Sequence, residues 1–459
     1  MKIVTINPTN EEVIAEHEMM SREEVVARVK RAKYEFERWR LDSHRRASIL
    51  YEAASTLRKE RERLARIATQ EMGKTIREAR AEVDKCAYTL EYFADNGESF
   101  IRDEVAVTDA RKSFLAFEPL GVIGSIMPWN FPYWQGIRFA APALMAGNTV
   151  VMKPSSATIQ CGKELERIFS VDNMGVFLTV IGDGRVGEML IDYTDAVTFT
   201  GSVEVGAKVA SKAGLLIKKC VLELGGSDPF IVLDDADIEK ASSAAVKGRL
   251  INNGQSCIAS KRFIVLKSVA GEFIESFVRK MEKVRVGDPM HEDTELGPLV
   301  NERSLSNTEH IVNEAISEGA ECLTGGKRLF DKGYFYAPTI LTKVKPSMRV
   351  VREEVFAPVA PIMVVDDERE AITAANDSEF GLGASIWTTD LDRADRVARN
   401  IQAGLVTINN VVVSDPRVPF GGVKKSGFGR ELSRYGMLEF MNIKTVRFYD
   451  QLIHYHHVE

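Results

Sequence analysis

The stretch LGVIGSIM (residues 120–127) marks the point where the texture of the chain changes. It is a short apolar run that ends at turn-forming residues, and similar runs follow at residues 148–154, 177–182 and 196–202. The segments between these runs are long enough for helices. This alternation predicts βαβ units around a parallel sheet, and therefore an α/β fold.

A second alternating region begins near Phe230 and contains the runs RFIVL, APVAPIMVV, ASIWTT and GLVTINN. The first hundred residues instead have a helical period, and Ser21 and Glu24 stand in capping-box spacing at the start of one helix. The sequence therefore predicts two open α/β domains with a cleft between them.

The composition of the 459-residue chain is that of a globular protein, with 45% hydrophobic and 27% charged residues. A net charge of −6 argues against a nucleic-acid partner, and no apolar run reaches the roughly 20 residues that span a membrane. The N-terminus lacks an apolar signal core, so we expect a cytoplasmic protein, and the five scattered cysteines fit a reducing compartment better than a disulfide framework. The seven histidines show no metal-ligand spacing, so no metal site is expected, and His454, His456 and His457 are interpreted as part of a solvated tail.

Two glycine motifs are candidates for phosphate binding. GDGRVG, with Gly182, Gly184 and Gly187, matches GxGxxG, but it lies late in the α/β region, so a tight connection is the favoured interpretation. FTGS (residues 199–202) is the better candidate. In that motif Gly201 permits a turn, and Ser202 can cap the next helix while offering its hydroxyl to an anion.

Three further stretches carry groups that can do chemistry. PWNFP (128–132) holds Asn130 between prolines, ELGG (223–226) puts Glu223 before a sharp turn, and NNGQSC (252–257) puts Cys257 in a polar turn. Taken singly, a proline turn, a surface acid and a buried thiol are the simpler interpretations.

Together with KPS (153–155), FTGS, EEVFAP (353–358) and PFGGVKKSGFGRE (419–431), these stretches resemble the motifs of the NAD(P)-dependent aldehyde dehydrogenase superfamily, in the family's order and over nearly the whole chain. The resemblance implies an α/β fold of the aldehyde dehydrogenase type that assembles as a homodimer or homotetramer. The expected units are a Rossmann-type dinucleotide-binding domain (1–100 and 120–225), a catalytic domain (226–440) and a small β oligomerisation arm (101–119 and 441–459).

The resemblance also implies the catalytic roles. Cys257 would attack the aldehyde carbon, and the resulting oxyanion would accept hydrogen bonds from the Asn130 side chain and the Cys257 backbone N–H. Glu223 would activate water to hydrolyse the thioester, and its presence favours a carboxylic acid product over transfer to coenzyme A.

The cofactor-binding residues implied by the same motifs are Trp129, Lys153, Ser155, Ser156, Gly201, Ser202, Glu354 and Phe356. Lys153 resembles the lysine that reaches the adenosine ribose, Ser202 a pyrophosphate contact, and Glu354 the residue that holds the nicotinamide ribose. Many NAD-preferring relatives carry glutamate where this chain has Ser156. Because serine removes the repulsion of a 2′-phosphate, we predict that NADP is preferred and that NAD is still used.

The stretches around Cys257 and before PFGG look most like the succinate-semialdehyde dehydrogenase branch. Such a substrate carries a carboxylate, so its site needs a cation or hydroxyl donors. We expect Arg138, Ser414 and Arg417 to bind it, with a structural salt bridge as the alternative for Arg138. Ile251 stands where some members carry a second substrate-binding arginine, which leaves another small polar aldehyde, such as glyceraldehyde or lactaldehyde, as the alternative substrate.

Two other classes of protein compete with this interpretation. A cysteine hydrolase would need a histidine beside Cys257, yet no histidine lies in any of the motifs, and His291 is the remaining candidate. A non-enzymatic protein on the same scaffold would be expected to have lost active-site residues, whereas Cys257, Glu223 and Asn130 are all present.

Overall fold

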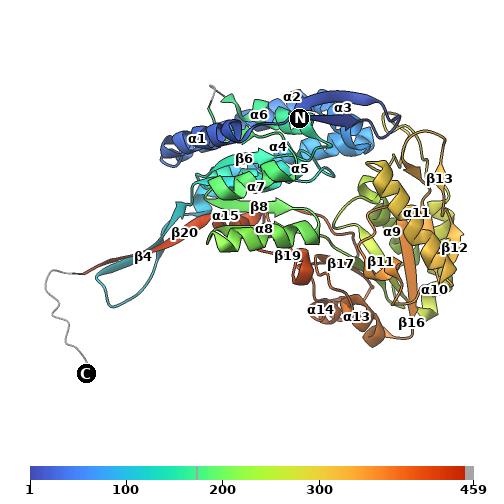
Figure 1. Cartoon of the computed structure of the whole chain (residues 1–459). Helices are drawn as coiled ribbons and strands as arrows, with labels where there is room; N and C mark the ends of the chain where they lie inside the picture. The colour runs from blue at the N-terminus through green and yellow to red at the C-terminus, as the bar shows by residue number, and fades with distance from the viewer. Residues whose placement is uncertain (172–173, 450–459) are drawn as a thin grey trace.

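Two open sheets form the body of the protein (Figure 1), and the computed structural model describes residues 1–171 and 174–449. The first sheet has the strand order β19-β9-β8-β5-β6-β7. Its strands are β5 (Val122–Ile126), β6 (Thr149–Lys153), β7 (Phe177–Thr179), β8 (Ala196–Thr200), β9 (Lys219–Glu223) and β19 (Gly427–Phe428). β5 to β9 pair in parallel and β19 is antiparallel to β9, which confirms the predicted α/β fold.

A topological switch point lies within this sheet. The chain places β6 and β7 on one side of β5, and then returns to place β8 and β9 on the other. The connecting helices are α5 (Trp134–Met145), α6 (Ile159–Phe169), α7 (Gly184–Tyr193) and α8 (Val203–Leu215). In doubly wound sheets a crevice opens at the carboxyl ends of the strands beside such a switch. The segments that follow β5 and β8, 127–132 and 201–202, therefore meet at one edge.

The second sheet has the order β12-β15-β16-β11-β10-β17-β18. Its strands are β10 (Asp228–Val232), β11 (Ser260–Leu266), β12 (Glu321–Thr324), β15 (Thr339–Thr342), β16 (Val359–Val365), β17 (Gly383–Trp387) and β18 (Leu405–Ile408). The helices around it are α9 (Ile238–Leu250), α10 (Lys267–Met281), α11 (Glu302–Ser317), α12 (Arg349–Arg352), α13 (Glu368–Asn376) and α14 (Leu391–Arg399). A small hairpin, β13 (Arg328–Leu329) and β14 (Phe335–Tyr336), and two 3-10 turns, η2 (Ile251–Gly254) and η3 (Lys424–Ser426), complete this half.

The first hundred residues are largely helical, as predicted. The hairpin of β1 (Lys2–Ile6) and β2 (Val13–Glu18) precedes α1 (Arg22–Trp39), α2 (Ser43–Lys59), α3 (Arg61–Met72) and α4 (Ile76–Phe100). The Ser21 side chain accepts the backbone N–H of Glu24, and the Glu24 side chain accepts that of Ser21, so the predicted capping box is confirmed.

A narrow sheet extends away from the body (Figure 1). It consists of β3 (Glu104–Val105), β4 (Lys112–Pro119) and β20 (Met441–Phe448), with β4 paired antiparallel to both neighbours. These strands lie in the ranges expected for the arm. The part of that expectation beyond residue 449, including the tail with His454, His456 and His457, lies outside the described residues.

The chain returns from the second sheet to the first before it ends. β19 pairs with β9, and Leu432, Met437 and Phe440, in and around α15 (Ser433–Leu438), belong to the hydrophobic core of the first sheet. The last residues before the expected boundary at residue 440 thus pack on the first sheet. Cys257 also packs against this core, although it precedes a strand of the second sheet. The nucleophile candidate thus lies between the two sheets.

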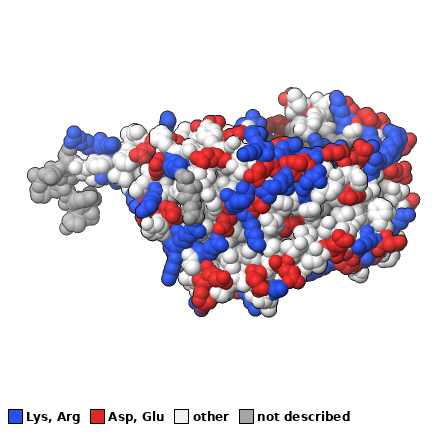
Figure 2. Space-filling model, turned by 90° about the horizontal axis from the view of Figure 1, so that it is seen from above, with Lys and Arg blue, Asp and Glu red and all other residues white. Residues whose placement is uncertain are grey.

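Acidic and basic side chains are interspersed over the face shown in Figure 2. This mixed surface accompanies a net charge of −6. In the described part of the chain, no helix combines the length and the apolar character needed to cross a bilayer.

Candidate active site

Cys257 follows a turn with an unusual backbone. Asn252, Asn253 and Gly254 have φ angles of 55°, 58° and 75°, in the left-handed region that asparagine and glycine adopt more readily than other residues. Both asparagine side chains are fully buried, and Asn252 Nδ2 donates to the backbone oxygen of Asn130 at 2.7 Å. The turn that presents Cys257 is therefore fastened to the PWNFP segment.

Two buried cations hold the same turn in place. Lys261 Nζ donates to the backbone oxygens of Ser256 and Cys257, both at 2.7 Å. Arg249 donates to the backbone oxygen of Gly254 at 2.7 Å. Hydrogen bonds that involve a charged group stabilise a fold by about 1.5–3 kcal/mol each. Neither residue could be predicted to hold the turn, because nothing in their local sequence shows that they reach back to it.

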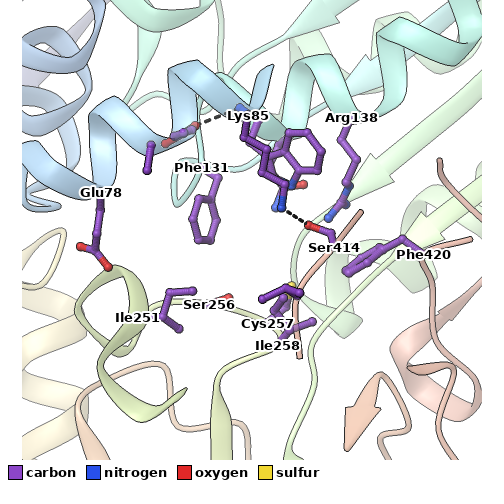
Figure 3. A pocket seen from close by; sticks show the side chains of 15 residues that line it. Glu78, Lys85, Phe131, Arg138, Ile251, Ser256, Cys257, Ile258, Ser414 and Phe420 are labelled. Carbon is purple, nitrogen blue, oxygen red and sulfur yellow. Dashed lines mark hydrogen bonds between the residues drawn. The ribbon is translucent and has the colours of Figure 1, made fainter. Parts of the chain in front are cut away.

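Two cavities meet at Cys257, which lines both of them. The first, which we name the Trp129 cavity, opens at the carboxyl edge of the first sheet. It brings together these predicted site residues: Trp129, Asn130, Gly201, Ser202, Cys257, Glu354 and Phe356. The second, which we name the Lys85 cavity (Figure 3), includes Glu78, Glu82, Lys85, Phe131, Trp134, Arg138, Ile251, Cys257, Ser414 and Phe420. A thiol at this junction can contact molecules bound on either side.

The Cys257 thiol is held in its neutral form. Burial raises its pKa to about 12, and the positive charges of Arg138 and Lys261 oppose this rise. Because the thiolate is the nucleophilic form, a base has to take the proton when a substrate binds. The thiol therefore has to lose its proton before it can act as a nucleophile.

The Asn130 side chain faces the same junction. It is 4% exposed, and its Nδ2 donates to the backbone oxygen of Gln255 at 3.1 Å. An amide nitrogen carries two N–H groups, so one is left for a further acceptor. Asn130 can therefore donate a hydrogen bond to an oxygen that develops negative charge beside Cys257.

Glu223 is buried at the end of β9 and is not among the residues that line the two cavities. Its side chain is 2% exposed, and neither carboxylate oxygen has a hydrogen-bond partner among the described residues. Burial, followed by the charge of Glu431, raises the pKa of Glu223 well above its ordinary value. A carboxyl group with a raised pKa is a better proton acceptor once it ionises. The structure thus gives Glu223 the chemistry of a general base but does not place it in either cavity.

The Trp129 cavity carries groups that fit a dinucleotide. Ser202 caps α8, a helix of 13 residues, so the N-terminus of that helix lies at the carboxyl edge of the sheet. Glu354 accepts a backbone N–H at 3.0 Å and lies 3.3 Å from Lys261 Nζ, which fixes its carboxylate. The rings of Trp129 and Phe356 pack edge to face, with centroids 5.8 Å apart. A helix N-terminus, a fixed carboxylate and aromatic walls suit phosphate, ribose and ring groups respectively.

The KPSS segment lies at the carboxyl end of β6, next to β5, but it does not line the Trp129 cavity. Lys153 is 8% exposed, and burial lowers its pKa. Ser155 Oγ accepts the backbone N–H of Ala157 at 3.3 Å, and Ser156 is half-buried. The GDGRVG glycines line neither cavity, and Asp183 in that motif caps α7.

Arg138 lines the Lys85 cavity but is already engaged in an ion pair. Its Nε donates to the Glu431 carboxylate, and the two side chains are only 2% and 1% exposed. Its guanidinium lies 4.4 Å from the centre of the Phe420 ring. The Nη2 group has no hydrogen-bond partner among the described residues. Arg138 therefore forms the salt bridge that was the alternative for it, and it keeps one donor for a further acceptor.

The structure corrects the prediction for Arg417. Its side chain is 65% exposed, donates to both oxygens of Asp415 at 2.9 and 2.6 Å, and lines neither cavity. Ser414, in the same loop, does line the Lys85 cavity and accepts a hydrogen bond from Lys85 at 2.6 Å. Sequence reasoning missed Lys85 because the helical period of α4 does not show which cavity one of its faces borders.

Comparison with known proteins identifies the chain. The model of the aldehyde dehydrogenase family matches residues 1–446. The chain belongs to the aldehyde dehydrogenase family. The resemblance carried by PWNFP, ELGG and NNGQSC is therefore confirmed, and so is the predicted class of enzyme, an NAD(P)-dependent aldehyde dehydrogenase.

Relatives within the family match over almost their entire length. A protein of Synechocystis sp. named probable succinate-semialdehyde dehydrogenase (NADP(+)) is 48% identical over 451 residues, which cover 97% of this chain and 99% of that protein. The succinate semialdehyde dehydrogenase (NAD(P)+) of Escherichia coli is 42% identical over 449 residues, with 96% and 97% covered. The crystal structure of succinic semialdehyde dehydrogenase from Streptococcus pyogenes with NADP+ superimposes with a TM-score of 0.95 at 34% identity, covering 98% of this chain and 100% of that chain. The aldehyde dehydrogenase type of fold is thereby confirmed.

Proposed function

We propose that the protein oxidises succinate semialdehyde to succinate, with NADP as the preferred cofactor and NAD as a second one. The observation that carries this proposal is the position of Cys257 at the junction of two cavities. The Trp129 cavity would hold the cofactor on one side of the thiol, and the Lys85 cavity would hold the aldehyde on the other. The names of the Synechocystis and E. coli relatives support the same substrate and cofactors.

The first step would be loss of the Cys257 proton to a water molecule and attack of the thiolate on the aldehyde carbon, which forms a C–S bond and moves the π electron pair of the carbonyl onto the oxygen. The oxygen would accept hydrogen bonds from the free N–H of the Asn130 side chain and from the Cys257 backbone N–H. One such donor stabilises a transition state by about 3–4 kcal/mol. The bond from Asn252 to the Asn130 backbone would keep the two donors in fixed relation.

NADP, held in the Trp129 cavity, would supply the acceptor for the hydride that leaves the carbon attached to sulfur, and Cys257 would then carry the acyl group as a thioester. Glu223 would then take a proton from water, and its buried, weakly acidic carboxyl group suits that task. Attack of the activated water would break the C–S bond, and the departing Cys257 sulfur would take the proton from Glu223, which returns the thiol. The product released is a carboxylic acid.

The pyrophosphate and nicotinamide ribose would bind in the Trp129 cavity. Gly201 and Ser202 lead into α8, whose first turn presents backbone N–H groups and a positive helix end. Glu354, fixed by Lys261, would accept hydrogen bonds from the ribose hydroxyls. Trp129 and Phe356 would border the nicotinamide ring.

The adenosine end of the cofactor would extend along the carboxyl edge of the first sheet to β6. Lys153 and Ser155 would contact its ribose. Ser156 puts no carboxylate at its own position, so a 2′-phosphate would meet no repulsion from this residue and would gain a hydroxyl donor. This is the physical basis for the proposed preference for NADP.

We also propose that the region around the first sheet (1–100 and 120–225) binds the dinucleotide and that 226–440 supplies the catalytic cysteine. The ranges 101–119 and 441–459 would join subunits into a homodimer or homotetramer. Exposed apolar side chains on the arm support that role, since Ile443 and Phe448 of β20 are 54% and 50% exposed.

A substrate and cofactor panel followed by NADPH absorbance tests the proposed function. We expect kcat/KM for succinate semialdehyde to exceed that for glyceraldehyde and lactaldehyde by at least about tenfold, or about 1.4 kcal/mol. A higher kcat/KM for either of the other aldehydes would overturn the proposed substrate. A kcat/KM with NADP about tenfold below that with NAD would overturn the proposed cofactor preference. A cysteine hydrolase would turn over its substrate without any nicotinamide cofactor and would lose that activity in His291→Ala. The His291 side chain is 79% exposed, which does not favour this alternative.

A further inference from the structure

One cation in the wall of the Lys85 cavity forms no ion pair with a carboxylate of the described residues, although Asp415 and Glu82 act on it from farther away. Lys85 projects from α4 (Figure 3), and its Nζ donates to Ser414 Oγ at 2.6 Å and lies 4.3 Å from the centre of the Trp134 ring. Within residues 1–171 and 174–449, no carboxylate forms an ion pair with it. A half-buried ammonium that no carboxylate contacts is less favourable than a paired one, so this end of the cavity is suited to a bound anion.

The other charged groups that line the cavity are already engaged. Glu82 accepts two backbone N–H groups at 2.9 Å and pairs with the buried Lys74. Glu78 accepts a backbone N–H of the turn before Cys257 at 2.7 Å. Arg138 pairs with Glu431. Lys85 is therefore the lining cation that these contacts leave without an ion pair.

Ser414 adds a second donor at the same place. Because its Oγ accepts the hydrogen bond from Lys85, its own proton is free to point toward another acceptor. An ammonium and a hydroxyl side by side can each donate to one oxygen of a carboxylate. Ile251 and Phe131, also in the wall, are apolar and suit the carbon chain between a carboxylate and a carbonyl at Cys257.

We propose that Lys85, together with Ser414, binds the carboxylate of the substrate and so selects aldehydes that carry a carboxylate at the far end of a short chain. This proposal rests on the function proposed above for the reaction at Cys257. It adds Lys85 to Arg138 and Ser414, two of the residues expected to bind the carboxylate, and leaves out the third, Arg417. The unpartnered Nη2 of Arg138, in the wall of the same cavity, would add a further donor.

The test compares the wild-type protein with Lys85→Met, which keeps an apolar stem and removes the charge. kcat/KM is measured for succinate semialdehyde and for butanal, a four-carbon aldehyde in which a methyl group replaces the carboxylate. The ratio of the two values is expected to fall about 10- to 100-fold, mainly through KM for the semialdehyde, as for the loss of one hydrogen bond to a charged group. Lys85→Arg, which keeps the charge, is expected to retain more of the ratio than Lys85→Met.

Arg61→Met is the matched control. It removes a cation that pairs at 2.7 Å with Asp84, the neighbour of Lys85 on α4, but that lies outside the cavity. We expect this variant to keep the wild-type ratio. A fall as large as in Lys85→Met would show a general effect of charge and would overturn the specific role of Lys85.

The outcomes separate the two proposals. A wild-type protein with no preference for succinate semialdehyde over butanal overturns the proposed function and the role of Lys85 with it. A wild-type preference that persists in a folded Lys85→Met variant overturns only the role of Lys85.

The wild-type protein provides a second measurement that does not depend on a variant folding. Burial, and then the charge of Arg138, lowers the pKa of Lys85 to about 8, while Cys86, Asp415 and Glu82 oppose the shift. Because the ammonium loses its proton as the pH rises through that value, KM for the semialdehyde is expected to increase above a pH of about 8. KM for butanal should not follow this titration. A semialdehyde KM that stays flat across this range contradicts the proposal.

Discussion

Replacing Arg138 with methionine removes one partner of a buried ion pair and leaves the Glu431 carboxylate without its counter-ion. The side chains are 2% and 1% exposed, so water cannot replace the lost contact. Breaking such a pair by removing one partner costs about 3–5 kcal/mol. With an unfolding entropy of about 2.1 cal/mol/K per residue, the 459-residue chain shifts its Tm by about 1 °C per kcal/mol. Arg138→Met is therefore expected to lower the Tm by about 3–5 °C.

Removing the other partner of the pair, Glu431, should destabilise the protein more than removing Arg138 does. Glu431 can neutralise itself by binding a proton, and burial already raises its pKa, whereas a guanidinium stays charged. Glu431→Gln is thus expected to lower the Tm further than Arg138→Met does. The double variant removes both charges, and it should be more stable than the sum of the two single losses by about 2 kcal/mol or more.

Differential scanning calorimetry measures the Tm of the wild type, the two single variants and the double variant. KM for succinate semialdehyde is determined for the same four proteins. Two results would refute the reasoning: a Tm for Arg138→Met within about 1 °C of wild type, or strictly additive losses in the double variant. If the Tm stays unchanged while KM rises, Arg138 serves the substrate and not the fold.

Two further predictions concern the chemistry at the junction. Because burial raises the pKa of the Cys257 thiol to about 12, its alkylation by iodoacetamide should speed up about tenfold per pH unit between about pH 7 and 9. Peptide mass spectrometry measures the alkylation rate, and a rate independent of pH would contradict this prediction. Glu223→Gln should lower kcat by about 10²–10⁴-fold while the thioester still forms. Rapid-quench kinetics should then show a burst of NADPH before slow turnover, and an unchanged steady-state rate would rule out Glu223 as the base.

Short stretches of sequence predicted the strands, the helix cap and the turn, because these structures depend mainly on residues that are close together in the chain. The apolar runs after residue 120 became parallel strands, because a chain segment of that kind is stable only when both faces are buried. Ser21 and Glu24 form the capping box, since the two residues need only each other and one helical turn. The polar NNG sequence before Cys257 gave a left-handed turn, because asparagine and glycine adopt that backbone with little strain.

Only the tertiary structure decided which charged groups meet. Lys85 and Ser414 are 329 positions apart in the chain, and Arg138 and Glu431 are 293 apart, yet both pairs are in contact. Arg417 stands beside a family motif but turns outward, because Asp415 is near enough to pair with it in solvent. The sequence by itself determined the family and the alternation of strands and helices, and it predicted Cys257 as the nucleophile. The packing of distant elements against one another decided which cations lie around Cys257, since the energy of a charge depends on its neighbours in space.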